Sequence, residues 1–263
     1  MFSSSFRKAM RVTAITQARS GSTRLPEKIF LEVGGQSLLE IHLLRLKRSK
    51  RIDHIIVATT TREEDLKVCA IANNLKLASF RGSENDVLDR FYQACRDKDT
   101  DYIIRITSDC PLIDPALIDL VVDTAIAKGV DYCSNVLIET FPDGQDIEVF
   151  TFSAMEKAWQ EATLHSDREH VTPYIRKNCN FNGGSMFTSL NVSADTDYGN
   201  IRMTVDEKED FDVIKNLITE LGIEKTWKEY ATLILSSRSI GTKNAHIKRN
   251  EGYHKSLKKE ENE

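Results

Sequence analysis

Hydrophobic residues alternate along the chain in a way that predicts strands and helices in turn from residue 11 onward. Short apolar runs at 12–18, 54–60, 77–80 and 102–107 predict buried strands. The amphipathic segments between and after them predict helices over about 37–50, 61–74, 83–95 and 115–128, with a Thr61/Glu64 capping box starting the second and Asp114–Pro115 starting the last. We therefore predict an α/β fold with a mostly parallel sheet flanked by helices, whose ligands bind at the carboxyl ends of the strands.

The pattern changes after Gly129. Runs at 132–136 and 146–152 predict two strands separated by a Pro-Asp-Gly turn, and 153–162 and 167–176 predict helices. The polar, glycine-bearing residues 180–193 predict an excursion from the core, after which 201–205 predicts a strand and 206–221 and 227–235 predict helices. The excursion from about 138 to 192 is too thin to bury its own apolar residues, so we expect it to pack against a second copy in a homodimer.

The two ends of the chain differ from this pattern. Residues 1–9 are rich in serine and predict a loose extension, so either Met1 or Met10 is the native start. Residues 10–235 form the predicted domain, and residues 236–263 are charged and sparse in apolar side chains, which predicts a tail, part of which docks on the body.

Composition and charge exclude several classes of protein. The 263 residues carry a net charge of -4, which argues against wholesale binding of nucleic acid. No apolar run is long enough to cross a bilayer and the N-terminus has no signal-peptide core, so we expect a cytoplasmic protein without membrane contact. The 5 cysteines show neither zinc nor disulfide spacing, which predicts reduced thiols.

The first predicted strand is followed by a loop whose composition is that of a phosphate-binding site. The sequence from residue 12 to residue 28 reads VTAITQARSGSTRLPEK. Its cations, hydroxyls and glycine suit an anion, and an unneutralised cationic cluster after a buried strand is unfavourable without one. The spacing is neither that of a P-loop nor that of a dinucleotide fold, and an ordinary polar connection is the alternative.

Two aspartates follow other apolar strands. Asp109 comes after 102–107 and Asp206 after 201–205. A carboxylate at a buried strand end needs a cation, and Mg²⁺ held by one or two carboxylates together with substrate phosphates would supply it. The alternatives are a simple turn at Asp109 and a helix N-cap at Asp206.

Further polar residues occur in the second half. Asp143, Asp146 and Glu148 alternate around a predicted strand, which is also the pattern of a solvated edge. Arg168 and His170 lie on a predicted helix, where His170 is either a general base or a structural hydrogen-bond donor.

Several motifs together resemble one family of enzymes. The opening QAR-x-GS-x-R-x-P-x-K is followed in order by FRGSENDVLDRF, RITSDCPLIDP, SNVLIETFPDGQDIEVF, REHVTPYI and RMTVDEKEDF. Together they resemble the spore coat polysaccharide biosynthesis protein F family, which is related to the acylneuraminate and 3-deoxy-manno-octulosonate cytidylyltransferases. The likeness covers the chain from about residue 11 to residue 235.

The resemblance implies a single GT-A-like, Rossmann-like nucleotidyltransferase domain with a small β/α dimerisation excursion. It implies a catalytic role for Arg19, Lys28 and Asp109, and Mg²⁺ ligation by Asp109 and Asp206. The implied nucleotide-binding residues are Ala18, Arg19, Ser20, Gly21, Ser22, Lys28, Arg81, Thr107 and Asp109. The implied acceptor-binding residues are Asp143, Asp146, Glu148, Arg168 and His170.

The implied activity is that of a CTP- and Mg²⁺-dependent cytidylyltransferase. It would convert an acidic sugar of the sialic or ulosonic type into its CMP derivative and release pyrophosphate, for surface polysaccharide biosynthesis. Such a transfer relies on positioning and charge neutralisation, so the absence of an obvious nucleophile is consistent with it. The alternatives are another nucleoside triphosphate, a sugar-phosphate acceptor, or a non-catalytic nucleotide-binding subunit.

Overall fold

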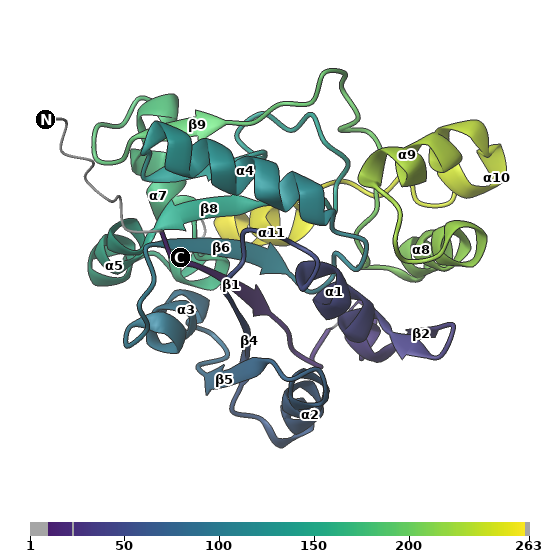
Figure 1. Cartoon of the computed structure of the whole chain (residues 1–263), viewed down its shortest axis with the longest axis horizontal. Coiled ribbons are helices and arrows are strands. Elements are labelled where there is room, and N and C mark those ends of the chain that lie inside the picture. Colours follow the sequence, from purple (N-terminus) through teal and green to yellow (C-terminus); the bar gives the residue numbers. More distant parts are fainter. Residues whose placement is uncertain (1–9, 23, 261–263) are drawn as a thin grey trace, which may run out of the picture.

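A computed structural model describes residues 10–22 and 24–260, so the predicted extension at residues 1–9 lies outside the described residues. The described chain forms a seven-stranded sheet in the order β5-β4-β1-β6-β8-β7-β9, flanked by helices (Figure 1). Its strands are β1 Val12–Gln17, β4 His54–Thr60, β5 Ala78–Gly82, β6 Tyr102–Thr107, β7 Tyr132–Ser134, β8 Glu148–Thr151 and β9 Ser189–Asn191. A separate hairpin joins β2 Glu32–Val33 to β3 Gln36–Ser37.

The helices of the described chain cover both faces of this sheet. They are α1 Leu38–Leu46, α2 Leu66–Asn74, α3 Val87–Cys95, α4 Pro115–Lys128, α5 Phe152–Glu161, α6 His165–His170, α7 Pro173–Asn178, α8 Lys208–Leu221, α9 Trp227–Ser236, α10 Arg238–Gly241 and α11 Glu251–Glu260. Short 3₁₀ turns lie at Lys28–Phe30, Glu63–Asp65 and Asn180–Asn182. None of the helices in the described ranges has the length and hydrophobicity needed to cross a membrane.

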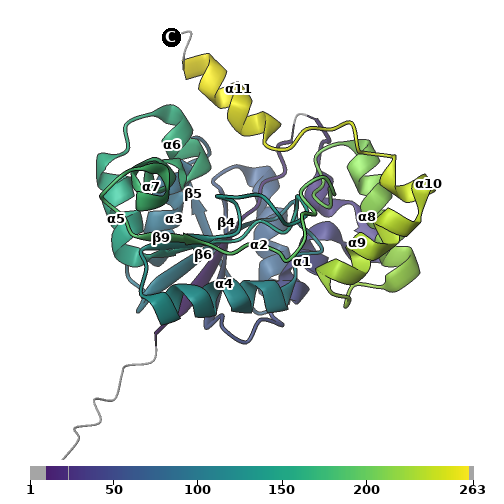
Figure 2. The same ribbon diagram turned by 90° about the horizontal axis from the view of Figure 1, so that it is seen from above.

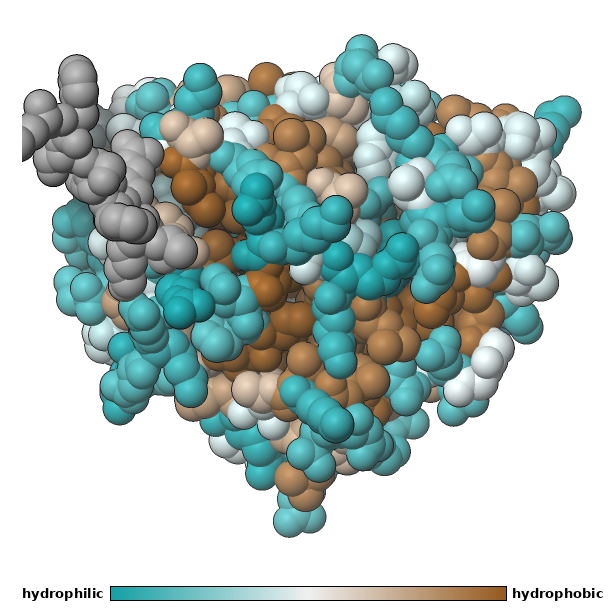
Figure 3. Space-filling view, in the orientation of Figure 1, coloured by the Kyte–Doolittle hydropathy of each residue, from teal (hydrophilic) through white to brown (hydrophobic). Residues whose placement is uncertain are grey.

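Alternate residues of the central strands point into two cores. Val12 and Ala14 of β1 belong to the core that α1, α4, α8 and α9 cover, and Ile15 belongs to the core that α3, α5 and α7 cover. A strand buried on both faces needs apolar residues at almost every position, which explains the continuous apolar runs in the sequence. The surface in the same orientation mixes apolar areas with rows of polar side chains (Figure 3).

Several elements form as predicted. β1, β4, β5 and β6 pair in parallel, and β4 and β6 occupy the predicted residues. Asp114 caps α4 by accepting a hydrogen bond of 2.8 Å from the N–H of Ala116, and Gly129 ends the helix with φ of 61°. The residues that terminate these elements act locally, so the sequence pattern is sufficient to find them.

The predicted strand at 201–205 is wrong. Within the described chain, its ladder contact is an isolated bridge between Asp143 and Arg202. The backbone N–H of Val205 donates to the carbonyl of Asp109 at 2.8 Å, and that of Met203 donates to Asp143 at 2.6 Å. The segment is therefore buried and extended, but it bonds to the loops at the end of the sheet and not to a strand.

One predicted helix is interrupted, and the predicted capping box of another is wrong. The predicted helix over 167–176 is two helices, α6 and α7, because Val171 has φ of 72° and Pro173 cannot continue a helix that began before it. Thr61 and Glu64 form no capping box. The hydroxyl of Thr60 instead accepts from the N–H of Arg62 at 3.1 Å and donates to Asp65, which draws 63–65 into a 3₁₀ turn ahead of α2.

The two regions predicted to leave the core contribute to the body. Within 180–193, β9 pairs in parallel with β7 as a strand of the main sheet, so the prediction that this segment lies outside the core is wrong for those residues. The described part of 236–263 forms α10 and α11. Its Asn244 is buried and donates to Asp210 at 2.8 Å.

The first testable prediction concerns His42 on α1. Its ring is fully buried between the hydroxyl of Thr16 and the carbonyl of Cys110, both at 2.9 Å. Burial lowers the pKa of His42 to about 4 from 6.5, so the unfolded chain binds a proton more readily than the folded chain between these values. The free energy of unfolding should be highest above pH 6.5 and fall by about 3 kcal/mol towards pH 4 through this group.

Urea unfolding across pH 4 to 7 measures this effect. His42→Gln should flatten the pH dependence of the free energy of unfolding. His54→Gln changes an exposed histidine, so this variant should show the same pH dependence as the native protein. An unaltered slope in the His42 variant would show that other groups cause the acid destabilisation.

Candidate active site

The carboxyl ends of β1 and β6 lie side by side and open onto one cavity. The two strands are parallel with Gln17 opposite Thr107, so the loops that follow them leave the same edge of the sheet. The cavity has a volume of about 470 Å³. Its lining includes Ala18, Arg19, Gly21, Ser22, Arg24, Lys28, Glu84, Asn85, Arg90, Arg105, Thr107, Asp109, Glu169, His170 and Asp206.

The two predicted metal-binding aspartates meet at one ammonium group. The Nζ of Lys28 lies 3.2 Å from Asp109 and 2.8 Å from Asp206. Arg24 also approaches Asp206 at 2.8 Å, and Arg202 contacts its other oxygen at 3.0 Å. The structure thus brings Lys28 into contact with Asp206, although the two residues are 178 positions apart in the sequence.

Lys28 and Asp109 stabilise each other's charged forms. Burial alone would raise the pKa of Asp109, but the Lys28 ammonium and its hydrogen bonds hold that pKa well below the usual range. Burial alone would lower the pKa of Lys28, but Asp109 and Asp206 hold it above its ordinary value. Lys28 therefore remains a cation between two carboxylates.

The donor set fits a divalent cation that is shared with a substrate. Asp109 and Asp206 both reach a single cationic atom, so their oxygens converge. Among the described residues there is no group of three or more His, Cys, Asp or Glu side chains that could hold a metal alone. Two convergent carboxylates on an open cavity match the way Mg²⁺ is bound together with phosphates.

A buried carboxylate shapes the loop after β1. Asp65 is fully buried. Its carboxylate accepts a 2.7 Å hydrogen bond from the N–H of Ser20 and a second hydrogen bond from the hydroxyl of Thr60. The side chain of Ser20 is buried without a hydrogen-bond partner among the described residues and does not line the cavity. Arg19 is half-exposed and lies 3.5 Å from Glu84. Asp65 therefore positions the loop, although the sequence pattern did not single it out.

Two predicted ligand-binding arginines are engaged away from the cavity. Arg81 donates to the backbone carbonyls of residues 60, 61 and 62 at 3.1, 2.5 and 3.0 Å. Arg168 pairs with Asp86 at 2.7 Å and donates to two carbonyls at 3.1 and 2.9 Å. Neither side chain lines a cavity, so the structure does not place them with the other predicted residues.

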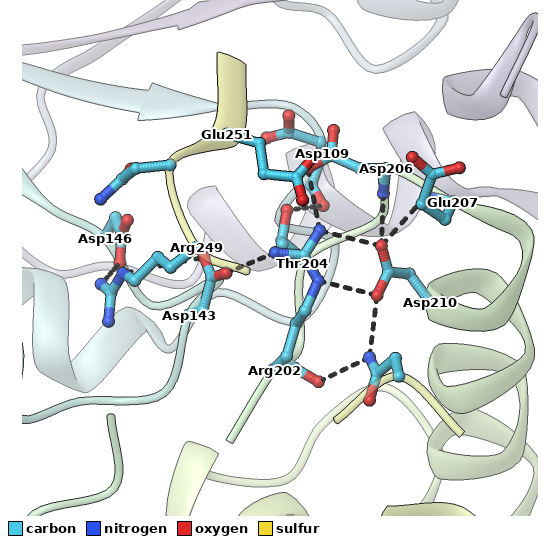
Figure 4. Close-up of polar contacts among 12 residues, drawn as sticks. Asp109, Asp143, Asp146, Arg202, Thr204, Asp206, Glu207, Asp210, Arg249 and Glu251 are labelled. Carbon is cyan, nitrogen blue, oxygen red and sulfur yellow. Dashed lines mark hydrogen bonds and ion pairs between the residues drawn. The ribbon is translucent and has the colours of Figure 1, made fainter. Parts of the chain in front are cut away.

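Asp143 and Glu148 are buried, Asp146 is half-buried, and each pairs with an arginine, which excludes the solvated-edge alternative. β8 lies between β6 and β7, and its Glu148 contacts Arg105 at 2.6 Å and Tyr132 at 2.5 Å. Asp143 pairs with Arg202 at 2.5 Å, and Asp146 pairs with Arg249 (Figure 4). Asp143 and Asp146 line a second cavity of about 190 Å³, whereas Glu148 lies behind Arg105.

His170 lies on the wall of the larger cavity. Its Nε2 is 3.1 Å from the hydroxyl of Ser256 on α11, and its ring meets that of Tyr253 edge to face. Burial lowers the pKa of His170 to about 4, so its ring is neutral at physiological pH. The contact with Ser256 agrees with the structural alternative and leaves the ring accessible from the cavity.

Arg90 is a cavity residue that the sequence pattern did not reveal. It lies on α3 with only 2% of its surface exposed, donates to the carbonyl of Ser83 at 3.1 Å and has no hydrogen-bond partner at Nε within the described chain. Burial, followed by the nearby charge of Arg19, lowers the pKa of Arg90 to about 10. A buried cation with a single hydrogen bond among the described residues is costly, and an anion bound in the cavity would complete its environment.

The fold and this site match an α/β nucleotide-transferring enzyme, with a cation-rich loop after β1 and two convergent carboxylates. The sequence profile of the family described as Cytidylyltransferase matches residues 13–237. The chain therefore belongs to the cytidylyltransferase family.

Individual relatives agree with this assignment. The spore coat polysaccharide biosynthesis protein SpsF of Bacillus subtilis is 32% identical over 79% of this chain and 86% of its own length. An uncharacterized protein of Methanocaldococcus jannaschii is 48% identical over 65% of this chain and 69% of its own length.

Solved structures share the fold. A cytidylyltransferase from Leptospira borgpetersenii superposes with a TM-score of 0.82 at 35% identity, over 88% of this chain and 97% of its own. A CMP:2-keto-3-deoxy-manno-octonic acid synthetase in complex with CTP has a TM-score of 0.58 at 15% identity, over 80% of this chain and 99% of its own. The second likeness concerns the fold alone.

Arg90→Met tests whether that arginine binds an anion, because it should affect thermal stability and pyrophosphate affinity differently. Removing a buried, poorly paired charge should leave Tm unchanged or raise it, while the affinity for pyrophosphate falls about tenfold or more. Arg81→Met is the matched control, because it removes three bonds to backbone carbonyls and should lower Tm without weakening pyrophosphate binding. Calorimetric titration and thermal unfolding of both variants measure these quantities. A large loss of Tm with unchanged affinity in the Arg90 variant would assign Arg90 a structural role.

Proposed function

We propose that this chain transfers CMP from CTP to an acidic sugar in a Mg²⁺-dependent reaction, for surface polysaccharide biosynthesis. An oxygen of the sugar attacks the α-phosphorus of CTP, the bond to the bridging oxygen breaks, and pyrophosphate leaves. The observation that supports this most is the meeting of Asp109, Asp206 and Lys28 beside the loop after β1. A relative named 3-deoxy-manno-octulosonate cytidylyltransferase, from Geobacter metallireducens, has 31% identity over 46% of this chain and points to an acidic sugar as the acceptor.

The cationic side chains of the cavity would bind the triphosphate. Arg19, Lys28 and Arg90 line the larger cavity from the loop after β1 and from α3. Guanidinium groups bind phosphate oxygens in a bidentate manner, and an ammonium group adds a point charge. Together they would neutralise the charge that accumulates on pyrophosphate as it leaves.

Asp109 and Asp206 would hold the Mg²⁺ ion. When bound there, the metal would stabilise negative charge on the phosphate oxygens as the transfer proceeds. Arg202, which contacts Asp206 as well as Asp143 and Asp210, keeps the Asp206 carboxylate oriented towards the cavity.

Arg105 is the residue best placed for the carboxylate of the acceptor. It lines both cavities, and its Nη1 pairs with Glu148 at 2.6 Å. Its Nε is buried and has no hydrogen-bond partner among the described residues. A donor therefore remains for an incoming anion at the boundary between the nucleotide cavity and the smaller one.

The test of this function is a matrix of nucleotides and acceptors. The purified protein should release pyrophosphate from CTP, in preference to ATP, GTP or UTP, in the presence of N-acetylneuraminate, 3-deoxy-manno-octulosonate or a smaller hydroxy acid. Asp109→Asn and Asp206→Asn should each lower kcat about 100-fold or more without loss of fold, because each keeps the shape and removes the charge. Asp123→Asn, an exposed aspartate on α4, is the control. Release with a sugar phosphate only, or near-normal kcat in either site variant, would contradict the proposal.

We also propose that the protein acts as a homodimer. Several large apolar side chains of residues 138–192 are exposed: Ile138 by 49%, Leu164 by 47%, Phe181 by 44% and Met186 by 39%. β9, from the same segment, lies at the edge of the sheet. A second copy of the chain would cover these groups.

Light scattering at micromolar concentration tests the assembly. The native protein should have the mass of two chains, and the double variant Phe181→Asp/Met186→Asp should have a mass closer to that of one chain. Leu120→Asp, at an apolar residue on α4 with 50% exposure, should leave the mass unchanged. A monomeric native protein would overturn the assignment.

A further inference from the structure

Residues 244–260, which we term the C-terminal strap, connect two distant parts of the body. At one end, Asn244 donates to the carbonyl of Arg202 at 3.3 Å and to Asp210 at 2.8 Å. At the other end, Ser256 donates to Glu169 at 2.8 Å, and Glu260 accepts from the N–H and hydroxyl of Ser166. Figure 2 shows α11 above the body, with its connection running back towards α8 and α10. The strap thus crosses the side on which the active site opens.

Between these anchors, one arginine of the strap pairs with the acidic residues beneath it. Arg249 binds Asp146 (Figure 4). It also donates to the carbonyl of Phe141 at 3.2 Å and lies 3.4 Å from Glu139. Its side chain is only 11% exposed. Burying several carboxylates together is unfavourable unless a cation compensates them, so Arg249 fixes both the strap and the acidic residues in place.

The residues after Arg249 form a wall of the smaller cavity. This cavity of about 190 Å³ is lined by Asn250, Glu251, Gly252 and Tyr253 from the strap and by Asp143 and Asp146 from the body. Its volume lies below the roughly 300–1,000 Å³ of pockets for drug-sized ligands, which suits one sugar-sized group. The lining is rich in carboxylates, amides and guanidinium groups, which pair well with hydroxyl groups.

The smaller cavity joins the larger one at the catalytic residues. Both are lined by the same six residues, Arg24, Arg105, Thr107, Asp109, Asp206 and Gly252. A ligand in the smaller cavity would therefore lie beside the phosphates of a nucleotide in the larger one. Gly252 of the strap belongs to both walls, so the strap closes the junction where the two substrates meet.

We propose that the C-terminal strap is the acceptor-side wall of the active site, with Asn250 and Tyr253 contacting the hydroxyl-bearing part of an acidic sugar. Arg249 is a positioning residue, which acts by holding Asp143, Asp146 and the strap together. This inference rests on the proposed function and deepens it. The strap lies beyond residue 237, where the match to the family ends, so it is a part of the site that the family assignment does not describe.

The proposal predicts a selective loss of acceptor binding. Asn250→Gly removes the amide and still permits the φ of 60° found at that residue, and Tyr253→Ala removes the ring. Each should raise the KM for the sugar acid that the native protein uses by about tenfold or more, with the KM for CTP within about twofold. Arg249→Gln should do the same, whereas Lys248→Gln, which removes one charge from an exposed neighbouring residue, should change neither value.

Steady-state kinetics with N-acetylneuraminate and 3-deoxy-manno-octulosonate, together with thermal unfolding of each variant, decide between the outcomes. The assignment of the strap is overturned if the variants have the same KM for the sugar acid as the native protein. It is also overturned if the KM for the sugar acid and the KM for CTP rise in parallel while Tm falls. If the native protein uses neither these two acids nor a smaller hydroxy acid with CTP, the proposed function itself fails and the strap assignment fails with it. Turnover by the native protein therefore separates the two failures.

Discussion

Everything in this active site depends on how the chain compensates two partly buried carboxylates that lie close together. Asp109 and Asp206 come from separate loops and would repel each other in a region of low dielectric. Lys28 lies between them, Arg24 approaches Asp206 from the loop after β1, and Arg202 holds its second oxygen. The position of each segment is thus fixed by charges that the other segments supply.

The same compensation extends outwards from Asp206 into the C-terminal region. Arg202 contacts Asp143 at 2.5 Å and Asp210 at 2.8 Å, and Asp210 in turn accepts from Asn244 (Figure 4). Arg249 then links the strap to Asp146. A continuous set of ion pairs and hydrogen bonds therefore joins the carboxylates proposed to bind the metal to residues that the sequence pattern assigns to a charged tail.

The fold could be predicted where local patterns decide the structure. The apolar runs at β4 and β6 and the caps of α4 contain the information that fixes them, so the prediction and the structure agree. Residues 201–205 have the same apolar pattern as a strand, but the backbone N–H of Val205 bonds to the carbonyl of Asp109. That choice depends on a loop almost a hundred residues earlier, which periodicity cannot register.

The residues of the candidate site likewise divide into those that the sequence predicts and those that only the structure reveals. Lys28 stands out in the sequence as part of a cation-rich loop, and Asp109 and Asp206 stand out because each carboxylate closely follows an apolar run. The structure brings all three together. The chemistry of a guanidinium group does not tell whether it faces a cavity or a row of carbonyls. The resemblance therefore assigns Arg81 to the nucleotide although its guanidinium binds backbone oxygens, and the sequence pattern gives no sign of Arg90, which is buried on α3. Only the three-dimensional surroundings distinguish the two arginines.

The protonation of the cluster limits what its residues can do in the proposed reaction. Because Asp109 and Asp206 hold the pKa of Lys28 above its ordinary value, Lys28 supplies charge and cannot accept a proton from the acceptor at neutral pH. Asp109 is ionised for the complementary reason, with its pKa held below the usual range by Lys28. The centre of the site is thus a set of fixed charges suited to binding phosphate and metal. Any group that receives the acceptor's proton must lie at its margin, where His170 is neutral and open to the larger cavity, or the proton must pass to the substrates themselves.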